Sequence, residues 1–201
     1  LRITTRGSVR VGSTAVQAFA NMDDLQLGDG SGNRGMTISS GTSNYGTIAF
    51  GDSTDGSGTD RYEGFVEYYH SDNSMRLGTL HTERLRITST GDLQRPKSLS
   101  QEVSTSVSSV SATSCGSFAK ATYRSAYVIA QITQGSSYQV GRYLVIHDGT
   151  TATTIEESAI ATGDMLGTFS GVVSGSNVEF RVTMSSASSA TVITKIESIV
   201  V

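Results

Sequence analysis

The sequence predicts an all-β protein, and three observations support this fold class. Ser, Thr and Gly together make up 79 of the 201 residues, a composition typical of strands joined by tight turns. Val and Ile number 17 and 12 against 10 Leu, and β-branched side chains pack better on a pleated sheet than on a helix. Short runs of alternating apolar and polar residues recur between glycine-rich turns, as expected for half-buried strands.

The composition also limits how such a fold can be stabilised. The single Cys115 cannot close a disulfide within the chain, which excludes a cysteine-stapled scaffold. Hydrophobic residues make up 36% of the chain and Trp is absent, so the core that one chain can build is small. We therefore expect other chains to bury part of the apolar surface. The net charge of −3 and the lack of a basic patch or a long apolar run predict neither nucleic-acid binding nor membrane insertion.

An internal repeat is the strongest organisational signal. The pattern Leu-Arg-Ile-Thr-x-x-Gly-x-apolar occurs at residues 1–9 and again at 85–93, an offset of 84 residues. Leu and Ile alternate with Arg and Thr, and Gly supplies a tight turn, so each copy predicts a short β-hairpin. Since the chain begins at Leu1, inside a copy and without a signal peptide, we expect a missing N-terminal part of a longer modular protein.

Between the two copies the expected strands are short. They cover residues 25–27, 36–38, 46–50 and 62–70, with glycine-rich turns between them. In the last of these strands large apolar side chains occupy both faces: Val66, Tyr68 and His70 share one face, and Phe65, Glu67 and Tyr69 share the other. This pattern is expected where one side packs within a subunit and the other against a neighbour.

A change in composition and charge near residue 94 predicts a domain boundary. The polar stretch that follows contains Pro96, the only proline, which favours extended conformations in the preceding residue. Residues 1–93 carry 8 basic and 11 acidic residues, whereas residues 94–201 carry 7 of each. We therefore expect a repeat-bearing module at 1–93, a linker at 94–101 and a second domain at 102–201.

In the second domain the predicted strands are longer, and apolar and polar residues alternate in them more regularly. Seven strands are expected, with an eighth at 103–110: residues 118–123, 127–133, 138–147, 153–161, 166–173, 178–184 and 192–200. In the sixth, Val178, Phe180, Val182 and Met184 alternate with polar residues. About a hundred residues with this many strands predict a β-sandwich of jelly-roll or Greek-key type.

Residues 25–93 resemble a module that recurs in phage tail fibres and related trimeric virion proteins. The resemblance rests on residues 28–30, on Tyr68 and His70, and on the Glu-Arg-Leu-Arg-Ile run at 83–87 that leads to Gly91. In many such fibres a self-cleaving intramolecular chaperone follows, but no Ser/Lys/His cleavage machinery or helical tail follows Leu93 here.

The second domain resembles the β-sandwich tips of fibres in phages of cyanobacteria. The similarity lies at four stretches, residues 118–119, 123–126, 144–150 and 166–169. The two resemblances imply an interwoven, trimeric, β-rich fibre shaft at 1–93 followed by a β-sandwich head at 102–201.

These resemblances imply a structural protein of the virion rather than an enzyme. The expected protein is a homotrimeric distal tail fibre that attaches to a bacterial surface polysaccharide or another receptor by multivalent binding. Other virion proteins would bind the missing N-terminal part. Two alternatives stay open: a polysaccharide depolymerase with an active site between subunits, and an architectural neck or baseplate fibre without receptor binding.

Candidate catalytic residues occur, but their surroundings argue against catalysis. Glu156 and Glu157 are adjacent, and strand neighbours point to opposite faces, so the two cannot flank one glycosidic bond. Cys115 and His147 could pair as nucleophile and base, but no orienting group or oxyanion motif accompanies them. We expect no catalytic residue and no cofactor, and Cys115 suits a small buried position.

An acidic loop raises the question of a metal. Asp52, Asp55 and Asp60 lie close together, and a calcium loop in register with Gly56 can be tried. The positions where that register lacks a ligand are Gly51, Ser53 and Tyr62. We therefore expect a solvated loop and no metal site.

His70 and Arg86 would each recur as a ring of three in a three-fold assembly. We expect His70 to hydrogen-bond within its own subunit; the alternative is that it faces the axis and holds water or an anion. Arg2, Arg84 and Arg86 are expected to bridge to acids such as Glu83 on neighbouring chains rather than bind nucleic acid.

Four tyrosines of the second domain could stack on sugar rings, although most suit the core or an interface: Tyr123, Tyr127, Tyr138 and Tyr143. The receptor-binding residues stay unassigned.

Overall fold

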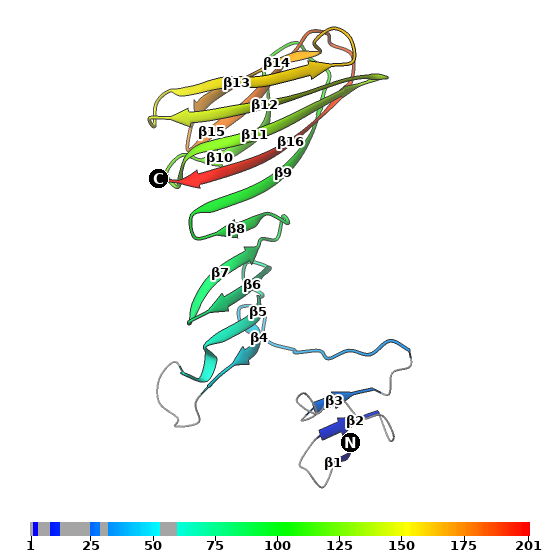
Figure 1. The fold of residues 1–201 in the computed structure, drawn as a ribbon, viewed down its shortest axis with the longest axis vertical. Coiled ribbons are helices and arrows are strands. Elements are labelled where there is room, and N and C mark those ends of the chain that lie inside the picture. Colours follow the sequence, from blue (N-terminus) through cyan, green and yellow to red (C-terminus); the bar gives the residue numbers. More distant parts are fainter. Residues whose placement is uncertain (1, 4–8, 13–24, 29–31, 53–59) are drawn as a thin grey trace. The chain divides into compact units, whose positions relative to one another are not determined.

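The structure is a computed structural model of the chain, and it describes residues 2–3, 9–12, 25–28, 32–52 and 60–201 (Figure 1). The chain is all-β, as the composition predicts, and most of its strands pair antiparallel. Within the described residues the one helical element is the short turn η1 (Asp60–Tyr62). The chain divides into two compact units, Leu1–Gly41 and Thr42–Val201.

The repeated pattern forms the predicted hairpin in both copies. In the first copy β1 (Arg2–Ile3) pairs antiparallel with β2 (Val9–Val11), and Ile3 is opposite Val9. In the second copy β7 (Thr82–Ile87) pairs with β8 (Leu93–Arg95), and Ile87 is opposite Leu93. The offset of 84 residues therefore preserves the strand register as well as the sequence. β2 continues into a parallel pair with β3 (Leu25–Leu27).

Gly91 makes the hairpin turn of the second copy possible. Its φ of 89° lies in the left-handed region, where a side chain would be strained. Its N–H donates to the carbonyl of Thr88 over 3.0 Å, and the N–H of Thr88 donates to the carbonyl of Asp92 over 3.0 Å. This geometry explains why the second copy has a glycine at this position.

The second unit is organised by one long sheet of ten strands, in the order β13-β12-β11-β16-β9-β8-β7-β6-β5-β4. The bounds of its remaining strands are β4 Tyr45–Phe50, β5 Gly64–Tyr69, β6 Ser74–Thr79, β9 Ser98–Val107, β11 Tyr123–Gln134, β12 Ser137–His147, β13 Ala152–Ala161 and β16 Ala190–Val200. A second sheet of three strands has the order β10-β15-β14. Its bounds are β10 Thr113–Ala119, β14 Gly167–Ser174 and β15 Asn177–Met184.

The stretch at 94–101 forms a hairpin instead of an open linker. It comprises the end of β8, a two-residue turn at Pro96 and Lys97, and the start of β9, with Leu93 opposite Ser100. Proline has no N–H to donate, and the turn position requires none, so Pro96 interrupts no ladder hydrogen bond. The sheet is therefore continuous from β7 through β8 and β9 into β16.

The strands of the sandwich lie close to the bounds predicted from the sequence, and most of the differences lie outside the sandwich. Residues 36–38, expected to form a strand, have no regular structure. β6 is an additional strand, and the strand expected at 118–123 is β10, which ends at Ala119 before a turn.

The two sheets pack face to face as a β-sandwich, and the core lies between them. Tyr143, Phe169 and Phe180 form its aromatic centre, with ring centroids 4.9–5.3 Å apart. The buried Gln139 ties the sheets together: its Nε2 donates to the carbonyl of Gly167 over 2.9 Å, and its Oε1 accepts from the N–H groups of Leu166 and Gly167. Each polar atom of this buried amide therefore has a partner.

No helix in the described part of the chain combines the length and apolar character that a membrane crossing requires.

Candidate functional site

The strands β4–β8 form a single layer, which we call the single-layer sheet (residues 45–95). Every buried hydrophobic residue of the described chain lies at Val107 or beyond, inside the sandwich. In the single-layer sheet Phe50 is 59% exposed, and the side chains of β5 are half-buried at most. A sheet gains stability by burying one apolar face against another element, and among the described residues of 42–201 no second layer covers these strands.

The strand register sorts the side chains of this sheet onto two unlike faces. Residues opposite each other in a ladder point to the same side, so Ile48, Val66, Leu77 and Leu85 form one row. Tyr68, Met75, Ile87 and Leu93 form the next row on the same side. We call this side the apolar face, and Phe50 lies at its margin opposite Gly64.

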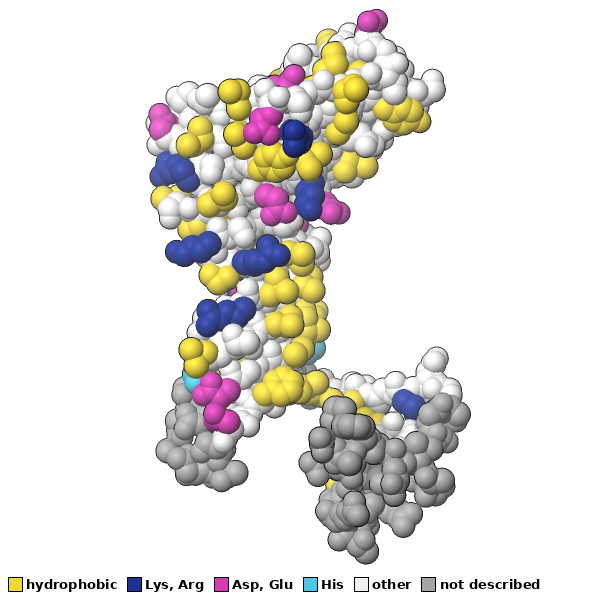
Figure 2. Space-filling view, in the orientation of Figure 1, with side chains coloured by type: hydrophobic (Ala, Val, Ile, Leu, Met, Phe, Trp, Pro, Cys, Tyr) yellow, Lys and Arg dark blue, Asp and Glu magenta, His cyan; other side chains and the backbone are white. Residues whose placement is uncertain are grey.

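The apolar face is open to solvent within one chain. Figure 2 shows hydrophobic side chains gathered in a band along these strands. The large hydrophobic side chains of this face are exposed by 37–59%: Ile48, Phe50, Met75, Leu77 and Ile87. A shallow hollow of about 440 Å³ lies here, lined by residues that include Phe50, Val66 and Leu77. A contiguous apolar surface of this kind marks a site of association.

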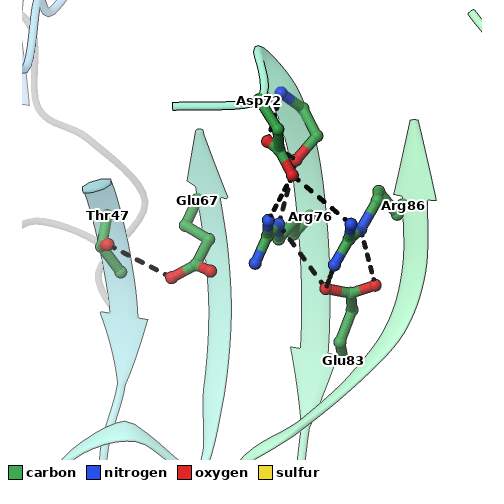
Figure 3. A network of polar contacts seen from close by, with 7 residues as sticks. Thr47, Glu67, Asp72, Arg76, Glu83 and Arg86 are labelled. Atoms are coloured by element: carbon green, nitrogen blue, oxygen red, sulfur yellow. Dashed lines mark hydrogen bonds and ion pairs between the residues drawn. The ribbon is translucent and has the colours of Figure 1, made fainter. Parts of the chain in front are cut away.

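The opposite face is polar and carries a network of ion pairs on β6 and β7 (Figure 3). Arg76 contacts Asp72 at 2.7 Å and Glu83 at 3.6 Å. Arg86 donates two hydrogen bonds to the carboxylate of Glu83, at 2.8 and 2.9 Å, and lies 3.4 Å from Asp72. The hydroxyl of Ser74 donates to Asp72 over 2.6 Å. Two cations and two anions thus satisfy one another within the chain.

These contacts shift the pKa values of two members of the network. The hydrogen bond from Ser74 and the neighbouring Arg76 hold the pKa of Asp72 below its ordinary value. The carboxylate of Glu83 raises the pKa of Arg86. Both shifts favour the charged forms of Asp72 and Arg86.

Aromatic side chains complete the polar face. The rings of Tyr45 and Tyr69 stack with centroids 4.1 Å apart, and the guanidinium of Arg76 lies 4.7 Å from the centroid of Tyr69. Phe65 covers Gly78 on the neighbouring strand, where any Cβ would clash with its ring. The polar face therefore finds its partners within the chain, and the apolar face is the candidate interaction surface.

The structure places Glu156 and Glu157 at the surface of the sandwich. Both are exposed on β13, next to a β-bulge in the pairing of β12 and β13, and Glu156 lies opposite Tyr143. Among the described residues no group of three or more His, Cys, Asp or Glu side chains is arranged to hold a metal ion. In the acidic loop Asp52 is exposed, whereas Asp55 and the side chain of Asp60 lie outside the described residues.

Cys115 and His147 are both buried, and each has a different backbone partner. The thiol of Cys115 donates to the carbonyl of Phe180 over 3.2 Å, and burial raises its pKa to about 12. Nε2 of His147 lies 2.7 Å from the carbonyl oxygen of Tyr123. A thiol with so high a pKa is a poor nucleophile, so this cysteine suits a packing role.

Within the chain, Arg86 pairs with its own Glu83, where we expected a bridge to a neighbouring chain. Arg84 donates to the hydroxyl of Thr79 over 3.1 Å, and the side chain of Arg2 lies outside the described residues. His70 follows β5 in a turn, and its ring meets Tyr68 edge-on with centroids 5.0 Å apart.

The four tyrosines of the sandwich separate into two groups. Tyr123 and Tyr143 are buried, and burial raises the pKa of both phenols. Tyr127 is half-buried and Tyr138 is 48% exposed. Only the second pair can contribute to a surface.

Sequence reasoning missed the ion-pair network because it missed β6. The signal was present, since Met75 and Leu77 alternate with polar residues in Ser74–Thr79. The turn into β7 was hard to foresee: Leu80 and His81 have φ angles of 51° and 55°, values that usually call for Gly or Asn.

Comparisons with models of known protein families and with curated proteins find no match.

Proposed function

We propose that this chain is the distal part of a homotrimeric virion tail fibre that attaches to the host surface. The single-layer sheet and the residues before it would form the shaft, and the sandwich would form the head. The observation that carries the proposal is the uncovered apolar face of the single-layer sheet. Such a face requires a partner chain, and the resemblance of residues 25–93 to trimeric fibre modules favours two further copies.

The repeated hairpin supports a modular shaft. Two copies of one pattern pair in the same register, 84 residues apart. A fibre built from such units gains length by repetition, while the ends of each unit keep the same pairing.

The loops at one end of the sandwich are the best candidates for host contact. β9 begins at Ser98, next to the single-layer sheet, and ends at Val107. Four connections lie at the Val107 end: residues 108–112, 135–136, 162–166 and 185–189. They are rich in Ser, Thr and Gly, and Gln134 donates to the carbonyl of Ser188 over 2.7 Å, which ties two of them together.

Multivalency would supply the affinity. Three weak sites on one assembly raise the effective concentration of each, so no deep pocket is required. Exposed hydroxyl and amide groups suit the hydroxyl-rich surface of a bacterial polysaccharide.

Solution mass tests the assembly. Light scattering of the 201-residue chain should give three times the chain mass of 21.1 kDa. A folded monomer at micromolar concentration would contradict the fibre proposal.

Host attachment needs a separate measurement. Labelled protein should bind host cells or their purified polysaccharide, and monovalent heads should bind far more weakly. Release of reducing sugar from the polysaccharide would favour the depolymerase instead, and absence of binding to any host surface would favour an architectural fibre.

A further inference from the structure

The outer surface of the ten-stranded sheet in the sandwich is unusually apolar. This outer face belongs to β11, β12, β13 and β16 and points away from the core. Eight aliphatic side chains lie on it with 38–69% of their surface exposed: Ile129, Val140, Leu144, Ile146, Ile155, Ile160, Ile193 and Ile199. The strand register places several of these side chains next to one another. Leu144 on β12, for example, lies opposite Tyr127 on β11 and opposite Ile155 on β13.

The other outer surface of the same sandwich is polar. On the three-stranded sheet Thr168 lies opposite Thr183, and Ser170 lies opposite Arg181. Glu179 and Arg181 pair there at 2.8 Å. Antiparallel sheets commonly bury one face and expose a polar one, and the three-stranded sheet follows that rule. The ten-stranded sheet departs from it.

A hollow marks the centre of the apolar surface. Its volume is about 470 Å³, and its lining includes Tyr127, Leu144, Ile146, Ile155 and Ile199. Branched aliphatic side chains offer no hydrogen bonds to sugar hydroxyls, and burying hydroxyls without partners is costly. The chemistry therefore favours an apolar protein surface over a glycan.

This surface lies on the same side of the sheet as the apolar face of the single-layer strands. Residues opposite one another share a side, and one row crosses the sheet from the single-layer strands into the sandwich. The row comprises Ile87, Leu93, Ser100, Glu197, Tyr127, Leu144 and Ile155. The two apolar surfaces therefore share one side of the sheet, with the polar Ser100 and Glu197 between them.

We infer that the outer face of the sandwich packs against a second copy of this chain, so that the head takes part in assembly. This inference rests on the proposed fibre, because it extends the interface of the shaft. The eight exposed aliphatic side chains together offer roughly 800 Å², the area per partner of an ordinary stable interface. Charges of both signs lie among them, because Arg142 and Lys195 flank Ile129 across the ladder and Glu197 lies opposite Tyr127, which suits association with a like surface.

Host contact then falls to other parts of the head. A receptor could not reach the outer face once a second copy covers it. The surfaces that stay accessible for receptor binding are the polar three-stranded sheet and the loops at the Val107 end of β9. The receptor-binding surface would thus be polar, with few aliphatic contacts.

Cysteine accessibility tests this interface without disturbing the fold. Leu144→Cys places a thiol in the centre of the outer face, and Val110→Cys is a matched control at an exposed loop position that is 53% accessible. The native Cys115 is fully buried and gives little background. The reaction rate of each purified variant with a water-soluble aromatic disulfide would be measured beside its solution mass.

In the assembled protein the thiol at position 144 should react at least ten times more slowly than the thiol at position 110. Adding Leu77→Lys, which places a charge on the apolar face of the single-layer sheet, should dissociate the chains and restore fast reaction at position 144. Protection that persists in a dissociated chain would overturn the inference.

Two further outcomes separate this inference from the proposed fibre. A trimer in which both thiols react equally fast overturns the head interface and leaves the fibre intact. A monomer in which both react equally fast overturns both proposals.

Discussion

The sandwich and the single-layer sheet use one ladder of strands in opposite ways. In the sandwich a second sheet covers one side, and Val128, Phe180 and Val192 are buried between the layers. In the single-layer sheet the large side chains of the apolar face are exposed to solvent, and the side chains of the polar face form ion pairs with one another. The contrast teaches that continuous hydrogen bonding does not make a self-sufficient domain; burial of a face does.

Removal of a core aromatic side chain should have the largest effect, and only on the sandwich. Phe180→Ala leaves a cavity beside Tyr143 and Phe169, and truncation of a buried Phe costs about 3–5 kcal/mol of unfolding free energy. Urea denaturation followed by circular dichroism measures the loss. Thr168→Ala, on the exposed polar surface, should change the free energy by less than about 0.5 kcal/mol.

A charge on the apolar face should act on assembly rather than on the fold of the sandwich. Leu77→Lys is expected to weaken chain association at least tenfold, because the ammonium group would be desolvated in the interface. Light scattering across a dilution series measures this change. Thr47→Lys lies on the polar face and is the control; equal dissociation by both variants would show that the apolar face is not the interface.

Removal of one member of the ion-pair network should lower the free energy of unfolding much less than Phe180→Ala does. Arg86→Gln removes the contacts with Glu83 and Asp72, and partly exposed pairs contribute about 0–1 kcal/mol each. The thermal midpoint should fall by a few degrees at low salt, and the difference should shrink in 1 M NaCl because salt screens the pairs. A salt-independent loss would point to packing by the Arg86 side chain.

The smallest expected effect is a change in the thermal stability of the sandwich at acid pH. Asp148 accepts hydrogen bonds from Thr150 and Thr151, which lower its pKa to about 2. A lowered folded pKa adds stability that is complete above the ordinary value of 3.8 and is lost as pH falls toward 2. Asp148→Asn should therefore flatten the fall in thermal midpoint between pH 4 and pH 2; an unchanged slope would show that other carboxylates dominate.

Much of the sandwich could be predicted because its strands carry local information. Alternation in Asn177–Met184 fixes which side chains point inward, and the glycine-rich turns mark the ends of neighbouring strands. The hairpin of β7 and β8 followed from the repeat alone.

The single-layer sheet was less predictable because its contacts depend on the pairing of strands. The network forms only when β6 and β7 pair with Arg76 opposite Arg86, and a bulge after Leu77 shifts the register. No local pattern fixes that bulge. Likewise, Pro96 predicted a linker at 94–101, because proline is common both in linkers and in tight turns between paired strands.

The repeated hairpin has a consequence for how such proteins diversify. After the first copy comes a short parallel strand, β3, and after the second comes the long antiparallel β9 that opens the sandwich. The same hairpin thus tolerates two unlike continuations without altering its own pairing. Genetic recombination within the stretch encoding this hairpin would exchange everything downstream while preserving the pairing of the hairpin itself, so whole C-terminal domains could be exchanged between genes.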